Sequence, residues 1–171
     1  QTYIQAIDDN PNGPPQLILQ FNENLIPSTT YTIQLGPVSD CWLNDTTLIG
    51  SFTLPEQAVA GDIVINEILA NPLNGGQDFI ELYNQSTKVV DLKDWQIANF
   101  YNDTISNIKT IANHYILAPG EFVAISEDTS FLLENYPATA SGRLIEMDMP
   151  SYNIDSGTVY LMLNSAQIDR V

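Results

Sequence analysis

The sequence predicts an all-β protein built from many short strands. Three observations favour this class. Runs of about four to eight residues rich in β-branched and aromatic side chains recur along the chain, as strands require. Clusters of Asn, Gly and Pro separate these runs and are typical of turns. Only residues 128–136 have the features of a helix. Short strands at such spacing indicate a sandwich or a barrel.

Residues 1–57 are expected to form a small antiparallel sheet. Strand-forming runs lie at residues 2–7, 17–21, 31–35 and 48–54. Turn residues separate them at 9–15, at 26–29 and at Gly36-Pro37. Four strands are few for an independent sandwich. We therefore interpret this segment as the later part of an immunoglobulin-like domain whose first strands are absent.

The stretch 55–61 has few large apolar residues and ends in Gly61, which is typical of a short connection. We place a linker at residues 58–61 and a second domain at residues 62–171. The expected strands of this domain are 62–69, 79–84, 89–92, 95–98, 106–109, 122–126, 144–147, 158–163 and 167–171.

One short helix is predicted at residues 128–136. Asp128 or Thr129 can cap its first turn, and Phe131, Leu132 and Tyr136 form one apolar side. A helix of this length is not stable alone, so it should pack over an end of the sandwich.

The charge of the chain excludes some classes of partner. It has 21 acidic and 5 basic side chains, which gives a formal net charge of -16. Nucleic-acid affinity rests largely on Lys and Arg, so nucleic acid and anionic membranes are not expected as direct partners. Cations, basic proteins and neutral glycans remain open. The single cysteine, Cys41, excludes an intrachain disulfide. No apolar run approaches the roughly 18 residues of a membrane helix, so no membrane insertion is expected.

The second segment resembles the lamin tail domain family, which includes modules of exported bacterial proteins. The likeness rests on Ile65-Asn66-Glu67-Ile68, on residues 78–84 (DFIELYN), on residues 92–97 (LKDWQI) and on residues 117–125 (LAPGEFVAI), supported by residues 156–161 (SGTVYL). The resemblance implies an immunoglobulin-like β-sandwich without catalytic activity. Animal lamin tails have basic, DNA-associated surfaces, and this chain has too few Lys and Arg residues for that role.

The first segment is similar to the end of a bacterial immunoglobulin-like domain, through residues 19–25 (LQFNENL) and 27–33 (PSTTYTI). This pairing of modules resembles surface or secreted proteins of Bacteroidetes-type bacteria. It implies an extracellular or cell-surface location in a Gram-negative bacterium. We therefore predict a non-enzymatic module that binds protein or glycan and positions a larger exported protein. A structural spacer without a ligand is the alternative, and a hydrolase is a third hypothesis.

Glu67 and Glu81 form the most distinctive pair of carboxylates. If residues 71–77 are a symmetric hairpin loop, residues whose numbers sum to 148 face each other, and Glu67 lies opposite Glu81. Opposed like charges are destabilising, with Cβ atoms roughly 5 Å apart. Either the register is offset, or the pair shares a cation or a proton. A retaining glycosidase also needs two carboxyl groups about 5 Å apart, which is the basis of the hydrolase hypothesis.

A second cation candidate lies at residues 8–13, where Asp8, Asn10 and Asn12 match the opening of a calcium loop. The twelfth position of that loop requires a bidentate Glu, and Leu19 stands there instead. A turn is the favoured interpretation. We predict no cofactor, with a structural cation such as calcium as the alternative.

Four aromatic side chains are candidates for ligand contact because they fall in expected loops or strand ends: Trp42, Phe100, Tyr101 and Tyr152. Aromatic rings at such places can stack on sugars or anchor a partner protein. Trp95, within the motif at 92–97, is expected in the core instead.

The remaining residues with reactive or metal-binding side chains give little evidence of function. His114 is the only histidine and is expected at the surface, because no second ligand or nucleophile accompanies it. Cys41 is expected to be a small buried apolar residue. Thr46 and Thr104 follow aspartates in triplets that resemble the O-glycosylation signal of exported Bacteroidetes proteins.

Overall fold

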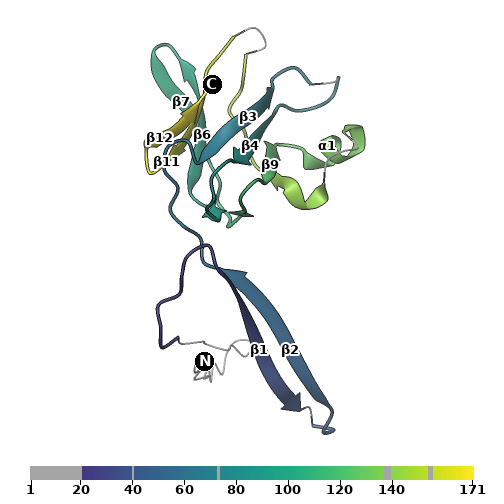
Figure 1. Ribbon diagram of the computed structural model, residues 1–171. Helices are drawn as coiled ribbons and strands as arrows, with labels where there is room; N and C mark the ends of the chain where they lie inside the picture. Colours follow the sequence, from purple (N-terminus) through teal and green to yellow (C-terminus); the bar gives the residue numbers. More distant parts are fainter. Residues whose placement is uncertain (1–20, 40, 73, 137–139, 154–155) are drawn as a thin grey trace, which may run out of the picture. The chain divides into compact units, whose positions relative to one another are not determined.

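A computed structural model describes residues 21–39, 41–72, 74–136, 140–153 and 156–171 (Figure 1). Within them it confirms the all-β class. The chain divides after Leu54 into two compact units. The strand expected at residues 2–7, most of that expected at 17–21 and the candidate calcium loop lie outside the described residues.

The first unit contains an antiparallel hairpin of β1 (Thr30–Ser39) and β2 (Asp45–Thr53). Tyr31 and Phe52 face each other across the strands, and their ring centroids are 5.5 Å apart. Gly36-Pro37 does not form the predicted turn. Strand β1 continues through it with a register shift between Leu35 and Val38. A proline lacks the N–H of a regular ladder, and an irregularity in the pairing accommodates it inside a strand.

The second unit is a sandwich of two four-stranded sheets. The first sheet has the order β10-β9-β4-β3, formed by Leu144–Glu146, Phe122–Ser126, Phe79–Asn84 and Ile63–Leu69. The second has the order β12-β11-β6-β7, formed by Ala166–Arg170, Val159–Leu163, Trp95–Tyr101 and Thr104–Thr110. A small pair, β5 (Val90–Asp91) and β8 (Ile116–Leu117), lies between them in sequence.

Tight turns connect the strands of two hairpins in the second sheet. Asn102 and Asp103 both have positive φ, and Tyr101 pairs with Thr104 across them. Two consecutive positive φ angles are typical of a type I′ turn, whose twist matches that of the strands. Strand β6 therefore runs to Tyr101 rather than ending at Ala98, as the sequence predicted.

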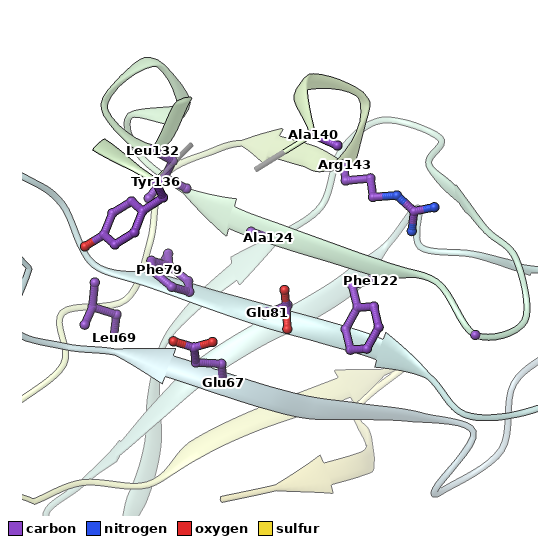
Figure 2. A pocket seen from close by; sticks show the side chains of 11 residues that line it. Glu67, Leu69, Phe79, Glu81, Phe122, Ala124, Leu132, Tyr136, Ala140 and Arg143 are labelled. Atoms are coloured by element: carbon purple, nitrogen blue, oxygen red, sulfur yellow. The ribbon is translucent and has the colours of Figure 1, made fainter. Parts of the chain in front are cut away.

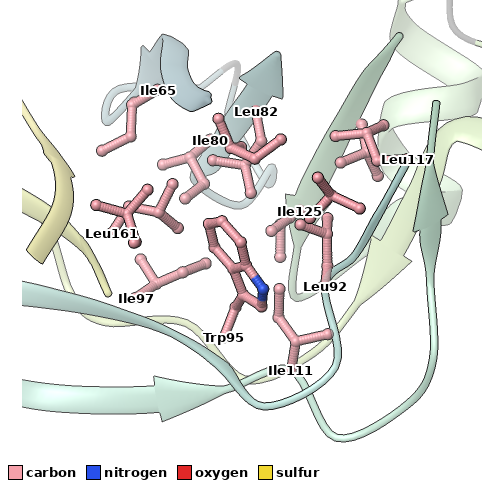
Figure 3. Packing of buried hydrophobic residues seen from close by; sticks show 14 of the residues in the cluster. Ile65, Ile80, Leu82, Leu92, Trp95, Ile97, Ile111, Leu117, Ile125 and Leu161 are labelled. Atoms are coloured by element: carbon pink, nitrogen blue, oxygen red, sulfur yellow. The ribbon is translucent and has the colours of Figure 1, made fainter. Parts of the chain in front are cut away.

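The inner faces of the two sheets share one apolar core (Figure 3). Trp95 of β6, only 1 % exposed, lies at its centre among fully buried aliphatic side chains. Ala58 is also buried in this cluster, and the Glu56 amide donates to the Val89 carbonyl at 2.8 Å. Residues 58–61, where the sequence analysis places a linker, belong to the second unit, and Ala58 fills space in its core.

Asn84, at the end of β4, is fully buried and fully hydrogen-bonded. Its amide nitrogen donates to the carbonyl oxygens of Lys88 at 2.8 Å and Leu117 at 2.9 Å. Its oxygen accepts from the amide and hydroxyl of Ser86, at 3.0 and 2.7 Å. A buried amide is stable only when its groups are paired. Asn84 therefore fixes the chain leaving β4 against β8.

A β-bulge at Asn66 changes the phase of strand β3. Before it, Ile65 pairs with Leu82, and after it Glu67 pairs with Glu81. Side chains alternate across a strand, so a regular strand with Ile65 inside would also place Glu67 inside. The extra residue turns Glu67 outward and allows Ile68 to pack against the core.

Strand β3 is an edge strand of its sheet among the described strands, and β12 covers part of that edge. The Ile65 amide donates to the Asp169 carboxylate at 2.7 Å, and the Gly61 amide donates to the Ile168 carbonyl at 3.3 Å. These contacts join the two sheets at one side of the sandwich.

The predicted helix is α1 (Thr129–Asn135), which lies beside β9 and β4 (Figure 1). Asp128 caps it by accepting from the Phe131 amide at 2.9 Å. Phe131 packs against Gly76, where a Cβ atom would lie 2.5 Å from the ring. Gly76 thus lets the β3–β4 loop approach the helix. None of the helices in the described residues has the length and apolarity to cross a membrane.

The bulge at Asn66 allows a test of how the phase of strand β3 affects stability. Deleting Asn66 removes the extra residue, so Ile65, Glu67 and Ile68 would point inward, outward and inward in a regular ladder, and the free energy of unfolding should fall by only about 1 kcal/mol or less. Asn66→Ala keeps the residue count and should cost about 1 kcal/mol or less, through the hydrogen bond to Glu81. Urea unfolding followed by circular dichroism measures both.

A third variant distinguishes a phase change from general damage. Deleting Val64 should lower the free energy of unfolding by about 2–5 kcal/mol, since Ile63 and Ile65 would become neighbours and one of them would turn out of the core. An Asn66 deletion that destabilises the fold as much as the Val64 deletion would contradict this account.

Candidate functional site

The outward face of the first sheet forms the floor of a hollow of about 640 Å³ (Figure 2). Pairing between β3 and β4 sets Glu67 opposite Glu81 and Leu69 opposite Phe79. Strand β9 adds Phe122, whose neighbour across the strands, Tyr83, stacks on it. We call this the carboxylate hollow, and its remaining lining residues are Gly120, Ala124, Leu132, Tyr136, Ala140 and Arg143.

Helix α1 and the short 3₁₀ helix η1 (Ser141–Arg143) supply the rim of the carboxylate hollow. Tyr136 packs edge-on against Phe79, with ring centroids 6.0 Å apart. The segment from β9 to β10 can place these side chains over the sheet because β9 and β10 are parallel. Parallel neighbours require a connection that crosses over the sheet.

The structure places Glu67 and Glu81 opposite each other, as the loop geometry predicts. Asn66 donates to Glu81 Oε1 at 2.7 Å, and Glu67 is exposed. Arg143 on the rim pairs with Glu121, with an Nη2–Oε1 distance of 3.0 Å. In the part of the chain that the structure describes, no Lys or Arg forms an ion pair with Glu67 or Glu81.

The candidate metal ligands do not assemble into a larger set. Among the described residues, no three His, Cys, Asp or Glu side chains lie together in a way that could hold a metal ion. Asp8, Asn10 and Asn12 lie outside those residues. Glu67 and Glu81 thus offer a cation two carboxylates beside the apolar residues Leu69, Phe79 and Phe122, while Arg143 on the rim pairs with Glu121.

A second hollow, of about 300 Å³, brings together three of the four predicted aromatic candidates. Phe100, Tyr101 and Tyr152 all line it, at the end of the sandwich where β3 and β6 finish and β11 begins. We call it the aromatic hollow, and its other lining residues are Ile68, Ala70, Asn99, Asn107, Ser151, Asn153, Gly157, Thr158 and Val159.

Tyr152 contributes to the wall of the aromatic hollow, but its hydroxyl group is not part of that surface. That oxygen is buried and has no hydrogen-bond partner among the described residues. Burial, and to a lesser degree the charge of Asp78, raise the pKa of Tyr152 well above its usual range. Burial also raises the pKa of Asp78, although the Tyr152 amide opposes this rise, and the nearby Glu127 adds to it.

His114 lies at the surface, where its Nδ1 contacts the Asp91 carboxylate. Asp91 also accepts from the Lys93 and Tyr115 amides, each at 3.1 Å. Burial alone would raise the pKa of Asp91, but the hydrogen bonds from His114 and these two amides outweigh burial. The pKa of Asp91 therefore lies below its ordinary value. These contacts hold β5 against the segment that leads into β8.

The other candidates lie apart from both hollows. Trp42, 82 % exposed, belongs to the first unit, in the segment between β1 and β2. Cys41 beside it is exposed, so the expectation of a buried cysteine is wrong. This segment between β1 and β2 lies outside the apolar core clusters of the described residues. Thr46 and Thr104 are both exposed, on β2 and at the start of β7, and their glycosylation stays a prediction.

The sequence analysis missed the apolar lining of the carboxylate hollow and the asparagine amides of the aromatic hollow. The outward placement of Phe79 was available, because Ile80 and Leu82 alternate with it. Asn99 and Asn107 lie on the β6–β7 hairpin, whereas Asn153 lies far along the chain before β11, so no local pattern connects the three amides.

Comparison with known proteins agrees with this architecture. Residues 56–171 match the family described as Lamin Tail Domain, over the whole of the sandwich unit. No curated protein matches the chain.

The Asp91 cluster predicts a pH-dependent contribution to stability. Asp91→Asn should lower the free energy of unfolding at pH 6 by about 1.5–3 kcal/mol, the range for hydrogen bonds to a charged group. The pKa of an unpaired aspartate in the unfolded chain is about 3.9, and the pKa of Asp91 in the folded chain is lower. Such a carboxylate stabilises the fold fully at pH values above about 3.9. It loses this effect as the pH falls through its pKa in the folded chain. The difference between Asp91→Asn and the unmodified chain should therefore shrink between pH 4 and pH 2.

Urea unfolding at pH 6 and at pH 2.5 checks this sign. Asp94→Asn is the matched control, because Asp94 is an exposed aspartate of the same segment. A destabilisation by Asp91→Asn that stays the same at both pH values would show that charge is not the cause.

Proposed function

The chain belongs to the lamin tail domain family, and we propose that it is a non-catalytic binding module that holds a larger exported bacterial protein to a protein partner. Membership supports an immunoglobulin-like module, and rigid β scaffolds commonly carry binding surfaces on their faces and loops. The observation that carries the proposal is the carboxylate hollow, where Glu67 and Glu81 face each other between apolar walls.

The chemistry of the carboxylate hollow suits a lysine or arginine side chain of a partner. Two opposed carboxylates repel each other, and a cation placed between them removes that repulsion. Leu69, Phe79 and Phe122 offer apolar surface beside the carboxylates for the aliphatic stem of such a side chain. The net charge of -16 would also attract a basic partner over a distance.

The proposed location is the cell surface or the exterior of a Gram-negative bacterium. It follows from the resemblance of both segments to modules of exported proteins. Nucleic acid is not a proposed partner, because only 5 basic side chains stand against 21 acidic ones.

Short peptides test the proposal. Acetyl-Leu-Arg-Leu-amide, titrated into isotope-labelled protein and followed by NMR, should shift the amide signals of Glu67, Leu69 and Glu81. Acetyl-Leu-Gln-Leu-amide should not, because it lacks the positive charge. Glu67→Gln combined with Glu81→Gln should weaken binding of the arginine peptide about tenfold, through loss of charge-assisted hydrogen bonds.

The control for total charge is Asp94→Asn combined with Glu134→Gln, two exposed acidic residues that do not line the carboxylate hollow. This pair should leave peptide binding nearly unchanged. Equal responses to the two peptides, or equal losses in the two double variants, would refute a specific cation site. A chain that responds to neither peptide nor to any glycan would instead be the ligand-free spacer.

The paired carboxylates also allow a test of the hydrolase hypothesis. Their spacing across a strand pair is compatible with a retaining glycosidase. The general acid of such an enzyme is held in an apolar, sheltered site, whereas Glu67 is exposed. We therefore expect no hydrolysis of a panel of nitrophenyl glycosides. Hydrolysis that disappears in the Glu67→Gln, Glu81→Gln variant would overturn the non-catalytic assignment.

A further inference from the structure

The aromatic hollow differs in character from the rest of the surface. The chain carries 21 acidic and 5 basic residues, yet none of the twelve residues that line this hollow is charged. The lining consists of aromatic rings, asparagine amides, hydroxyl groups and small apolar residues. Within the described lining, an anion would find no basic group and a cation would find no carboxylate. The ligand that this lining fits is therefore neutral.

The polar groups of the aromatic hollow match a ligand with several hydroxyl groups. Asparagine supplies both a donor and an acceptor, and the Ser151 and Thr158 hydroxyls can do either. Aromatic rings bind the C–H face of a sugar by burying it. Phe100 and Tyr101 keep 38 % and 63 % of their surface exposed, so both rings are accessible. A volume of about 300 Å³ lies at the lower end of the range for small-ligand sites.

The floor and walls of the aromatic hollow are held in place by the sandwich. The Asn99 amide donates to the Ser151 carbonyl at 2.8 Å, and its oxygen accepts from the Ser106 hydroxyl at 2.7 Å. Phe100 packs against Tyr160, with ring centroids 5.9 Å apart. Tyr101 directly precedes the tight turn of the β6–β7 hairpin. Side chains fixed in advance lose little freedom on binding.

From this combination we infer that the aromatic hollow is a binding site for a neutral glycan, independent of the carboxylate hollow. Tyr101 is the stacking surface, and the amides of Asn107 and Asn153 bind hydroxyl groups at the rim. Asn99, whose amide already bonds within the protein, positions the Tyr101 ring by fixing the end of β6 against residue 151. A glycan on the partner surface could then be bound together with a basic peptide.

A glycan array carrying neutral and charged oligosaccharides, followed by NMR with the neutral disaccharides lactose, cellobiose and N,N′-diacetylchitobiose, tests this inference. Binding to at least one neutral glycan should shift the signals of Asn99, Phe100, Tyr101 and Asn107. Tyr101→Ala should weaken it about tenfold, whereas Tyr101→Phe should retain it, because stacking needs the ring. Phe122→Ala, which removes an aromatic ring from the carboxylate hollow, is the matched control and should leave sugar binding unchanged.

The same protein sample, titrated with the arginine peptide, distinguishes the two proposals. Peptide binding without any neutral glycan binding would overturn the glycan site alone. Glycan binding without peptide binding would support the glycan site and refute the protein-binding proposal. Charged glycans that bind as well as neutral ones, or neutral glycans whose binding is equal in the unmodified chain and in Tyr101→Ala, would also overturn the inference.

Discussion

The apolar core between the two sheets is the constraint on which the rest of the sandwich depends. Trp95 lies at its centre, and every strand that faces it must present an apolar side chain at alternate positions. Strand β3 cannot satisfy this rule over its whole length with a regular ladder, because Ile63 and Ile65 have one phase and Ile68 has the other. The bulge at Asn66 resolves the conflict. The outward position of Glu67, and so the carboxylate hollow, follows from a requirement of the core.

The fold could be predicted largely where short-range pattern determines structure. The bounds of β4 and β9 match the prediction because their apolar residues alternate without interruption, and Asp128 caps the helix as its residue type favours. The prediction failed where tertiary context decides. Gly36-Pro37 has the composition of a turn, but the pairing of β1 with β2 continues through it. Strand β8 has only two residues, too few to carry a pattern.

The candidate sites were also predictable where short-range pattern determines structure, and not where tertiary context decides. Counting along one hairpin was enough to set Glu67 opposite Glu81, and the exposed ends of strands indicated Phe100, Tyr101 and Tyr152. The sequence did not predict which other residues surround these side chains. The aromatic hollow gathers groups from β3, β6, β7 and the segment before β11, which are distant in sequence and meet only because two sheets pack face to face.

The carboxylate of Asp169 has a consequence for solubility. An unpaired amide on an edge strand is a template on which a strand of another molecule can add, and long apolar edges therefore aggregate. Strand β3 is rich in isoleucine and lies at an edge among the described strands, which makes it the segment of this sandwich best suited to such growth. Asp169 occupies the Ile65 amide and brings a negative charge to that edge. A side chain from the opposite sheet thus both joins the sandwich and discourages fibrous association of neighbouring molecules.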